Sequence, residues 1–291
     1  MDELDFSKPA QPRPQQPAMP APKQVYNAAM ALEFFRAGGK PESAAGGTRF
    51  FEENEKAGFL KRDKMYLLME GEVTLIAKGK VIGIVKAGEI FGEMAAISES
   101  PRSATAMAKT ECRVIALDDK EFLKALAVKP EFALMLMGMM ILRLRTMIAR
   151  LAQNHALLAG GAGESRGFDK DMVSALAKGL GEQATVRHGA GTSLFKEGSA
   201  GALAYVVLDG RVAVSIQGKV VEHVGPGGIF GEMALVDQAT RAASAAAETD
   251  CALVAINRAV FINLVKANPE FGAALLSAVA ERVRFIAARV K

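Results

Sequence analysis

The 291-residue chain has no tryptophan, two cysteines and three histidines. His155, His188 and His223 are scattered, with no His-x-His or other ligand spacing, so the sequence predicts no metal centre. Cys112 and Cys251 sit in similar apolar runs, and we expect buried, unpaired thiols in a reducing compartment. The N-terminus lacks the basic and apolar regions of a signal peptide, which favours a cytoplasmic location.

Net charge and chain length indicate which partners and how many domains to expect. The net charge is +4 with 23% charged residues, and no basic block stands out, so we expect no nucleic-acid partner and no membrane partner. A chain of this length predicts about two domains, each with its own core.

A repeat divides the chain in the same way. Equivalent residues lie 139 positions apart over a long stretch, as in the pairs Tyr66 and Tyr205, Gly71 and Gly210, Phe91 and Phe230, Arg102 and Arg241, Cys112 and Cys251, and Pro130 and Pro269. A repeat of this length is a duplicated domain and not a short solenoid unit. The register breaks upstream of Tyr66, where the first copy has a longer loop around Lys56 to Asp63.

Each copy carries the same charged motif. The sequence Phe-Gly-Glu-Met-Ala starts at Phe91 and at Phe230, and an arginine follows each glutamate nine residues later. A guanidinium is a planar two-pronged donor that suits a phosphodiester, and free N–H groups of a short helix after the glycine add to this. A carboxylate beside a phosphate is repulsive unless it accepts a proton from a hydroxyl, such as a ribose 2′-OH.

Phe-Gly-Glu-Met-Ala followed by Pro-Arg-Ser-Ala-Thr resembles the phosphate-binding cassette of the cyclic nucleotide-binding domain family. That family includes the bacterial cAMP receptor protein and protein kinase A regulatory subunits. The resemblance implies a mainly β fold of two tandem, jelly-roll-like β-rolls with flanking helices, each followed by a long helix. It implies that glutamate binds the ribose and arginine the cyclic phosphate. The expected ligand-binding residues are Gly92, Glu93, Met94, Ala95, Arg102, Ser103, Ala104, Gly231, Glu232, Met233, Ala234, Arg241, Ala242 and Ala243.

We expect four segments. Residues 1–24 form a disordered proline-rich tail, 25–152 the first domain with its C-terminal helix, 153–167 a flexible glycine-rich linker and 168–291 the second domain. Helices are predicted at 25–36, 93–97, 120–127, 131–151, 169–180 and from 268 onward. Strands are predicted at 49–51, 65–69, 73–77, 80–85, 114–116, 184–186, 193–195, 204–208, 212–216, 219–224 and 252–255.

The helix over 131–151 is rich in methionine and apolar almost all round from Phe132 to Leu142. We judge it too short to cross a bilayer, so it needs a second helix or subunit beside it, as core or as an adaptable interface. In the resembled family the helix after the roll supplies a lid over the purine. Arg143 and Thr146 are the candidates for that lid.

The resulting hypothesis is a non-catalytic receptor, with no catalytic residues, that binds cAMP in both cassettes, with cGMP an alternative ligand at the first site. One carboxylate per site gives no acid–base pair for hydrolysis. No DNA-binding domain is expected after the second roll. The output would pass through the long helices to a protein partner or a homo-oligomer, with the tail or the methionine-rich helix as contact surface. The alternative is a constitutive scaffold in which one or both pockets no longer bind ligand.

The two cassettes differ in ways that predict which site binds its ligand more tightly. Pro101 restricts the loop before Arg102, whereas Thr240 precedes Arg241. Asp237 stands where the first copy has Ser98 and would add negative charge near an anion. We therefore expect the first site to bind more tightly.

Overall fold

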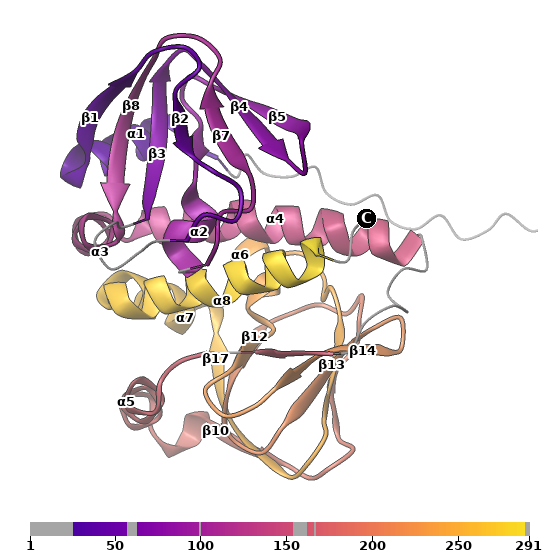
Figure 1. The fold of residues 1–291 in the computed structure, drawn as a ribbon. Helices are drawn as coiled ribbons and strands as arrows, with labels where there is room; N and C mark the ends of the chain where they lie inside the picture. Colours follow the sequence, from indigo (N-terminus) through magenta and orange to yellow (C-terminus); the bar gives the residue numbers. More distant parts are fainter. Residues whose placement is uncertain (1–25, 57–62, 99, 154–161, 166, 289–291) are drawn as a thin grey trace, which may run out of the picture.

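The computed structural model describes residues 26–56, 63–98, 100–153, 162–165 and 167–288. Two β-rolls lie at opposite ends of the molecule, and helices α4 and α8 run between them (Figure 1). The expectation of a mainly β fold with flanking helices is therefore confirmed. The proline-rich tail, the loop over 57–62 and the linker residues 154–161 lie outside the described residues.

The first roll precedes the helix that ends its domain. Its strands are β1 Lys40–Ala44, β2 Arg49–Phe51, β3 Lys64–Glu70, β4 Glu72–Ala77, β5 Lys80–Lys86, β6 Ile90–Phe91, β7 Thr105–Ala108 and β8 Cys112–Asp118. Its helices are α1 Ala28–Gly38, α2 Glu93–Ser98, α3 Asp119–Val128 and α4 Glu131–Gln153. Two four-stranded sheets, in the orders β1-β8-β3-β6 and β2-β7-β4-β5, face each other. All their pairings are antiparallel.

The second roll repeats this order and adds one strand, β9, at the edge of a sheet. Its strands are β9 Gly163–Ser165, β10 Thr185–His188, β11 Ser193–Phe195, β12 Leu203–Asp209, β13 Val212–Ile216, β14 Lys219–Val224, β15 Ile229–Phe230, β16 Ser244–Ala247 and β17 Cys251–Asn257. Its helices are α5 Lys170–Leu180, a 3-10 turn η2 Glu182–Ala184, α6 Glu232–Asp237, α7 Arg258–Ala267 and α8 Pro269–Ala287. Its sheets have the orders β10-β17-β12-β15 and β11-β16-β13-β14-β9.

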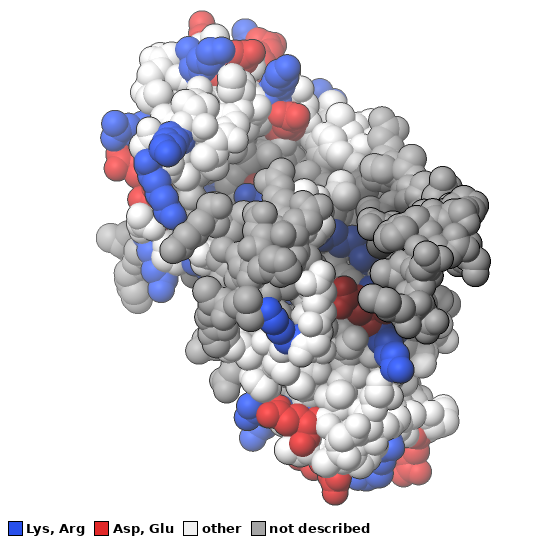
Figure 2. All heavy atoms as spheres, turned by 90° about the vertical axis from the view of Figure 1, so that its right-hand side faces the viewer, with Lys and Arg blue, Asp and Glu red and all other residues white. Residues whose placement is uncertain are grey.

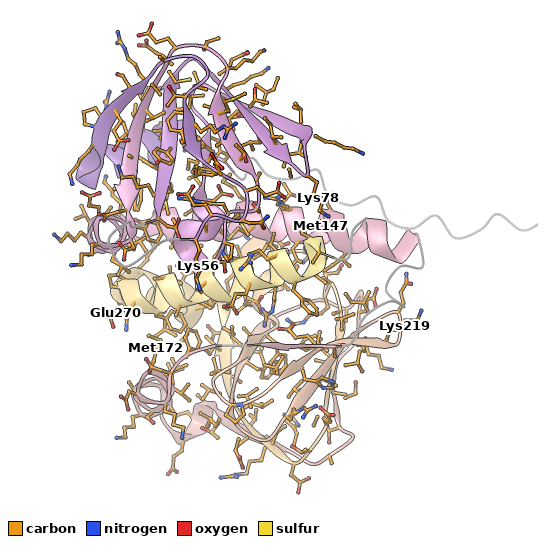
Figure 3. The ribbon with its side chains drawn as sticks, in the orientation of Figure 1. Lys56, Lys78, Met147, Met172, Lys219 and Glu270 are labelled. Atoms are coloured by element: carbon orange, nitrogen blue, oxygen red, sulfur yellow. The ribbon has the colours of Figure 1, made fainter. Side chains whose placement is uncertain are left out.

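The turns show why the two copies fold alike. The β4–β5 hairpin has Lys78 and Gly79 at φ 49° and 72°, and the β13–β14 hairpin has Gln217 and Gly218 at φ 49° and 77°. Positive φ at both central residues gives the turn whose twist matches that of paired strands. Lys78 and Lys219 mark these hairpins in Figure 3. Charges of both signs are interspersed over the outer ends of the rolls in Figure 2.

Helix α4 packs between its own roll and α8. Four of its methionines, Met135, Met137, Met140 and Met147, are buried in a core cluster that draws side chains from both domains. Met147 lies where α4 faces α8 (Figure 3). The methionines therefore fill core space within this chain, and the second helix that α4 requires is α8.

The expectation that this helix is too short to cross a bilayer was wrong. Helix α4 has 23 residues, and its segment Glu131–Ala149 is long and apolar enough to cross a membrane by length and composition. Half of that segment is buried inside the protein. Its composition is thus accounted for by two packed faces, because a helix buried on several sides is apolar all round.

Several elements were missed or misplaced. The expected flexible linker contains strand β9, which pairs in parallel with β14. Strands β1, β7 and β16 and helix α7 were not predicted, and Ala184 belongs to the 3-10 turn η2 and not to a strand. Both cysteines are buried and unpaired, as expected.

Candidate functional site

Both cassettes begin with a glycine in the left-handed region. Gly92 has φ 77° and Gly231 has φ 80°, which other residues rarely adopt. A Cβ at Gly231 would lie 2.8 Å from Nη1 of Arg241. Glycine is therefore required on two grounds, the backbone conformation and the close approach of the cassette arginine.

The two arginines are held in the same way. Nη1 of Arg102 donates to the carbonyl of Gly92 at 2.7 Å, and Nη2 donates to the carbonyl of Lys64 at 2.9 Å. The equivalent distances for Arg241 are 2.8 Å to Gly231 and 2.6 Å to Leu203. Each guanidinium also lies about 4 Å above a phenylalanine ring, that of Phe51 in the first domain and that of Phe195 in the second.

The charge around these arginines differs. Nη2 of Arg102 pairs with Oδ1 of Asp63 at 3.0 Å. The equivalent of Asp63 in the second domain is Ala202. Nε of Arg241 is buried and has no hydrogen-bond partner among the described residues. A buried donor without a partner is costly, so the second cassette has a cationic group suited to an anionic ligand.

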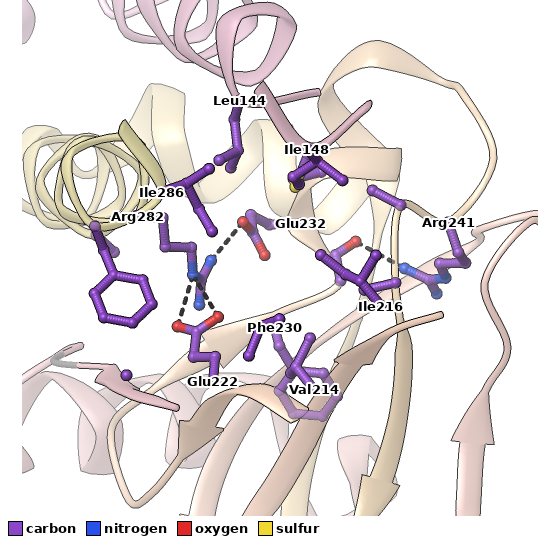
Figure 4. A pocket seen from close by; sticks show the side chains of 18 of the residues that line it. Leu144, Ile148, Val214, Ile216, Glu222, Phe230, Glu232, Arg241, Arg282 and Ile286 are labelled. Carbon is purple, nitrogen blue, oxygen red and sulfur yellow. Dashed lines mark hydrogen bonds and ion pairs between the residues drawn. The ribbon is translucent and has the colours of Figure 1, made fainter. Parts of the chain in front are cut away.

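A cavity of about 280 Å³ opens onto the second cassette (Figure 4). All seven residues predicted for this cassette line it, namely Gly231, Glu232, Met233, Ala234, Arg241, Ala242 and Ala243. Its remaining walls are mostly apolar and include Val214, Ile216 and Phe230 of the roll. The cavity thus places one carboxylate and one guanidinium beside an apolar space, the combination that a nucleotide requires.

Three further charged residues, Glu222, Glu281 and Arg282, line this cavity and were not predicted. Arg282 of α8 contacts Glu232 through Nη1 at 2.6 Å and Glu222 of β14 through Nε at 2.9 Å. Burial lowers the pKa of the Arg282 guanidinium, but the charges of Glu222 and Glu232 outweigh it and leave that pKa above its ordinary value. Glu232 itself is only 1% exposed. The cassette carboxylate Glu232 is therefore held by an arginine from α8.

The repeat could have identified Arg282 as a site residue. It lies 139 positions after Arg143, so the predicted lid residue has its counterpart in the second domain. Glu222 gave no such signal, because the equivalent residue in the first domain is Gly83. Leu144 and Ile148 of α4 also line the second cavity, although they belong to the helix of the first domain.

In the first domain Glu93 begins α2 and is partly exposed. Burial raises the pKa of its carboxyl group, and the positive charges of Arg143 and Arg102 lower that pKa in part. Glu93 forms no ion pair within the part of the chain that the structure describes. Of the other residues predicted for this cassette, Met94, Ala95 and Ala104 are buried and Ser103 is exposed.

The candidate lid residues are exposed on α4. Arg143 is near enough to act on Glu93 electrostatically. The hydroxyl of Thr146 donates to the carbonyl of Leu142 in its own helix at 2.9 Å. Among the described residues, no group of three or more His, Cys, Asp or Glu side chains is placed to hold a metal ion.

The comparison with known families agrees with this geometry. The family model described as the cyclic nucleotide-binding domain matches residues 42–129 and 185–268. The chain belongs to the cyclic nucleotide-binding domain family. Each match covers one roll with its cassette, so the domain occurs twice in this member of the family.

Relatives at the level of whole sequences include regulatory proteins. The chain is 26% identical over 225 residues to the cAMP-dependent protein kinase regulatory subunit of Schizosaccharomyces pombe, covering 77% of this chain and 50% of the relative. It is 33% identical over 99 residues to the cyclic AMP receptor protein of Thermus thermophilus, covering 32% of this chain and 46% of that protein. The chain therefore spans half or less of the length of these relatives.

Two solved structures show a weak likeness to this chain. The regulatory domain of Toxoplasma gondii protein kinase A with cAMP has a TM-score of 0.28 at 21% identity, covering 79% of this chain and 83% of that one. The regulatory subunit of a cAMP-independent protein kinase A from Trypanosoma brucei has a TM-score of 0.30 at 19% identity, covering 83% and 85%.

Proposed function

We propose that this chain is a non-catalytic receptor that binds a cyclic mononucleotide in each of its two cassettes, with cAMP as the first ligand to test. The observation that carries the proposal is the cavity of the second domain, which brings Glu232 and Arg241 to one apolar space. The identical anchoring of Arg102 supports the same role for the first cassette.

The chemistry of the second cavity fits such a ligand. The unpartnered Nε of Arg241 supplies a donor for the cyclic phosphate, a charge-assisted hydrogen bond. Arg282 contacts Oε1 of Glu232, so Oε2 is the acceptor that remains for the ribose 2′-hydroxyl. Phe195, Val214 and Ile216 offer apolar surface to a purine. One ligand thus has a partner for its phosphate, its sugar and its base.

The proposed output is regulation of a protein partner. The matched relatives from fungi are named as regulatory subunits of a cAMP-dependent kinase, which makes a protein partner the natural readout. Helices α4 and α8 are the proposed relay, because α8 lines the second cavity and packs on α4. A homo-oligomer and a cytoplasmic location are further parts of the proposal.

Thermal unfolding of the full chain with cAMP, cGMP and 5′-AMP tests this function. A ligand at about 100 times its Kd stabilises the folded state by about 2.7 kcal/mol, which raises Tm by several degrees. We expect the cyclic nucleotides to raise Tm and 5′-AMP to leave it unchanged. No shift with any cyclic nucleotide would contradict the proposal and favour the constitutive scaffold.

A further inference from the structure

The cavity of the second domain has a wall that comes from the first domain. Leu144 and Ile148 of α4 line it, facing residues of the second roll. In Figure 4 both side chains lie above Glu232, on the side of the cavity opposite Val214 and Phe230. Residues four apart on a helix share one face, so this pair presents a continuous aliphatic surface.

A partly buried ion pair holds α4 in this position. Arg145, next to Leu144, pairs with both carboxylate oxygens of Asp237, and its Nη2 lies 3.1 Å from Oδ1. Asp237 is the last residue of cassette helix α6, and the two side chains are only 16% and 20% exposed. Two parallel hydrogen bonds between guanidinium and carboxylate fix orientation as well as distance. The first domain is thereby fastened directly to the second cassette.

This contact is particular to the second cassette. The equivalent of Asp237 in the first cassette is Ser98, whose hydroxyl donates to the carbonyl of Met94 within its own helix. Among the described residues, the cation that pairs with Asp237 therefore comes from the first domain.

We propose that the second binding site is shared between the two domains, with Leu144 and Ile148 of α4 forming the roof over the ribose and phosphate and Arg145 holding that roof to the cassette. This inference rests on the proposed function. Aliphatic side chains in the same cavity as Glu232 and Arg241 exclude water, and charge-assisted hydrogen bonds are stronger where the local dielectric is low.

The arrangement also brings the two sites to one short stretch of α4, from Arg143 to Ile148. Arg143 acts electrostatically on Glu93 of the first cassette, and Leu144, Arg145 and Ile148 contact the second. A shift of α4 that alters the surroundings of Glu93 also moves the roof of the second cavity.

The test compares two substitutions of equal size at the roof. In full-length protein carrying Glu93→Ala, which removes the first ribose carboxylate, the Kd for cAMP is measured by calorimetry for Ile148→Asn and Ile148→Asp. Both variants lose the aliphatic contact, but only aspartate places a negative charge over a phosphodiester. We expect Ile148→Asp to bind about tenfold more weakly than Ile148→Asn, as Coulomb repulsion in a partly buried site predicts.

Leu142 provides the matched control. It lies on the same helix, is 41% exposed and does not line the cavity. Leu142→Asn and Leu142→Asp are expected to have the same Kd, because an exposed charge away from the ligand is screened. Equal affinities of the two Ile148 variants, with binding intact in their parent, would overturn the shared site and leave the proposed function standing. A parent that binds no cyclic nucleotide at either site would overturn both.

A second variant tests the proposal independently, in case the substitutions at Ile148 prevent folding. Arg145→Gln removes the cation that pairs with Asp237 but leaves the roof residues in place. We expect second-site affinity for cAMP to fall several-fold, and we expect Asp237→Asn added to Arg145→Gln to cause little further loss, since paired residues are not additive. Unchanged affinity in Arg145→Gln would contradict the proposal.

Discussion

Arg282 of α8 and Glu232 of the second cassette form an ion pair at 2.6 Å, whereas Arg143 and Glu93, at the same positions of the repeat, form none among the described residues. Glu222 explains part of the difference, because it holds the other side of the Arg282 guanidinium and its counterpart is a glycine. The two cassettes therefore share a motif but not its electrostatic surroundings.

Removing Arg282 should destabilise the protein strongly. Arg282→Met leaves two carboxylates without their cation in a buried site, and breaking a buried pair in this way costs about 3 to 5 kcal/mol. Arg143→Met is the matched control at an exposed position, with an expected change of about 0.5 kcal/mol or less. Urea unfolding of both variants gives the comparison. Similar losses at the two positions would show that the triad around Arg282 contributes no more than a surface arginine.

Replacing the two cassette carboxylates, Glu93 and Glu232, by glutamine should affect stability differently. Burial raises the pKa of Glu93, so its carboxylate opposes folding, and Glu93→Gln should leave the protein as stable as wild type or more stable at neutral pH. Glu232→Gln removes a charged partner of Arg282 and should lower the free energy of unfolding by about 1 to 3 kcal/mol.

The pH dependence separates the effect at Glu93 from a packing effect. When the pKa of a carboxyl group is higher in the folded than in the unfolded state, the free energy of unfolding falls as pH rises from the unfolded-state pKa, about 4.3, to the folded-state pKa. The loss is complete above the folded-state pKa. The advantage of Glu93→Gln over wild type should therefore be present at neutral pH and vanish below about pH 4. An advantage that persists at low pH would point to packing.

The structure removes one ground for ranking the first site as the tighter. The charge of Asp237 is paired with Arg145, while Arg102 in the first cassette is paired with Asp63. We now expect the second site to bind cAMP more tightly. Binding curves for Arg241→Lys, which keeps the first site, and Arg102→Lys, which keeps the second, test this order. The tighter curve should belong to Arg102→Lys.

Each lysine substitution should also weaken its own site. A lysine cannot donate along two fixed directions, as Arg241 does to Gly231 and Leu203. Loss of charge-assisted hydrogen bonds of about 2 to 4 kcal/mol corresponds to a roughly 30- to 1000-fold higher Kd. Unchanged affinity at the second site in Arg241→Lys would remove this residue from the phosphate site.

The second site should prefer cAMP to cGMP. Ala242 follows Arg241 and lines the cavity, and its methyl group offers no hydroxyl to the 2-amino group of guanine. Ala242→Ser should raise cGMP affinity about fivefold, the value of one hydrogen bond, and leave cAMP affinity nearly unchanged. Ala243→Ser, which also adds a hydroxyl beside the cavity, is the control in a competition assay. Equal gains in both variants would refute a specific contact at position 242.

The cassettes could be located from sequence because they depend on local signals, whereas the tandem β-roll fold was implied by the resemblance to the cyclic nucleotide-binding domain family. The sequence shows a glycine before each cassette glutamate, an arginine nine residues after that glutamate, and a constant offset of 139 residues between the copies. The structure gives both cassette glycines a positive φ. These signals identified the seven residues of the second cassette, all of which line the cavity.

The rest of the site depends on contacts between distant segments. Glu222 meets Arg282 only because β14 and α8 come together, and Leu144 lines the second cavity only because α4 packs on α8. Strand β9 has too few residues for a periodic signal and lies among glycines, so composition favoured a linker. Side-chain spacing gives the face of a helix but not the domain that the face meets.

Calorimetric titration of the full chain with cAMP tests the central claim, that both cassettes bind a cyclic nucleotide. Wild type should show two binding events, Glu93→Ala and Glu232→Ala should each keep one, and the double variant should bind none, with thermal unfolding confirming that each variant is folded. Heats that are absent from wild type, or that persist unchanged in the folded double variant, would contradict the claim.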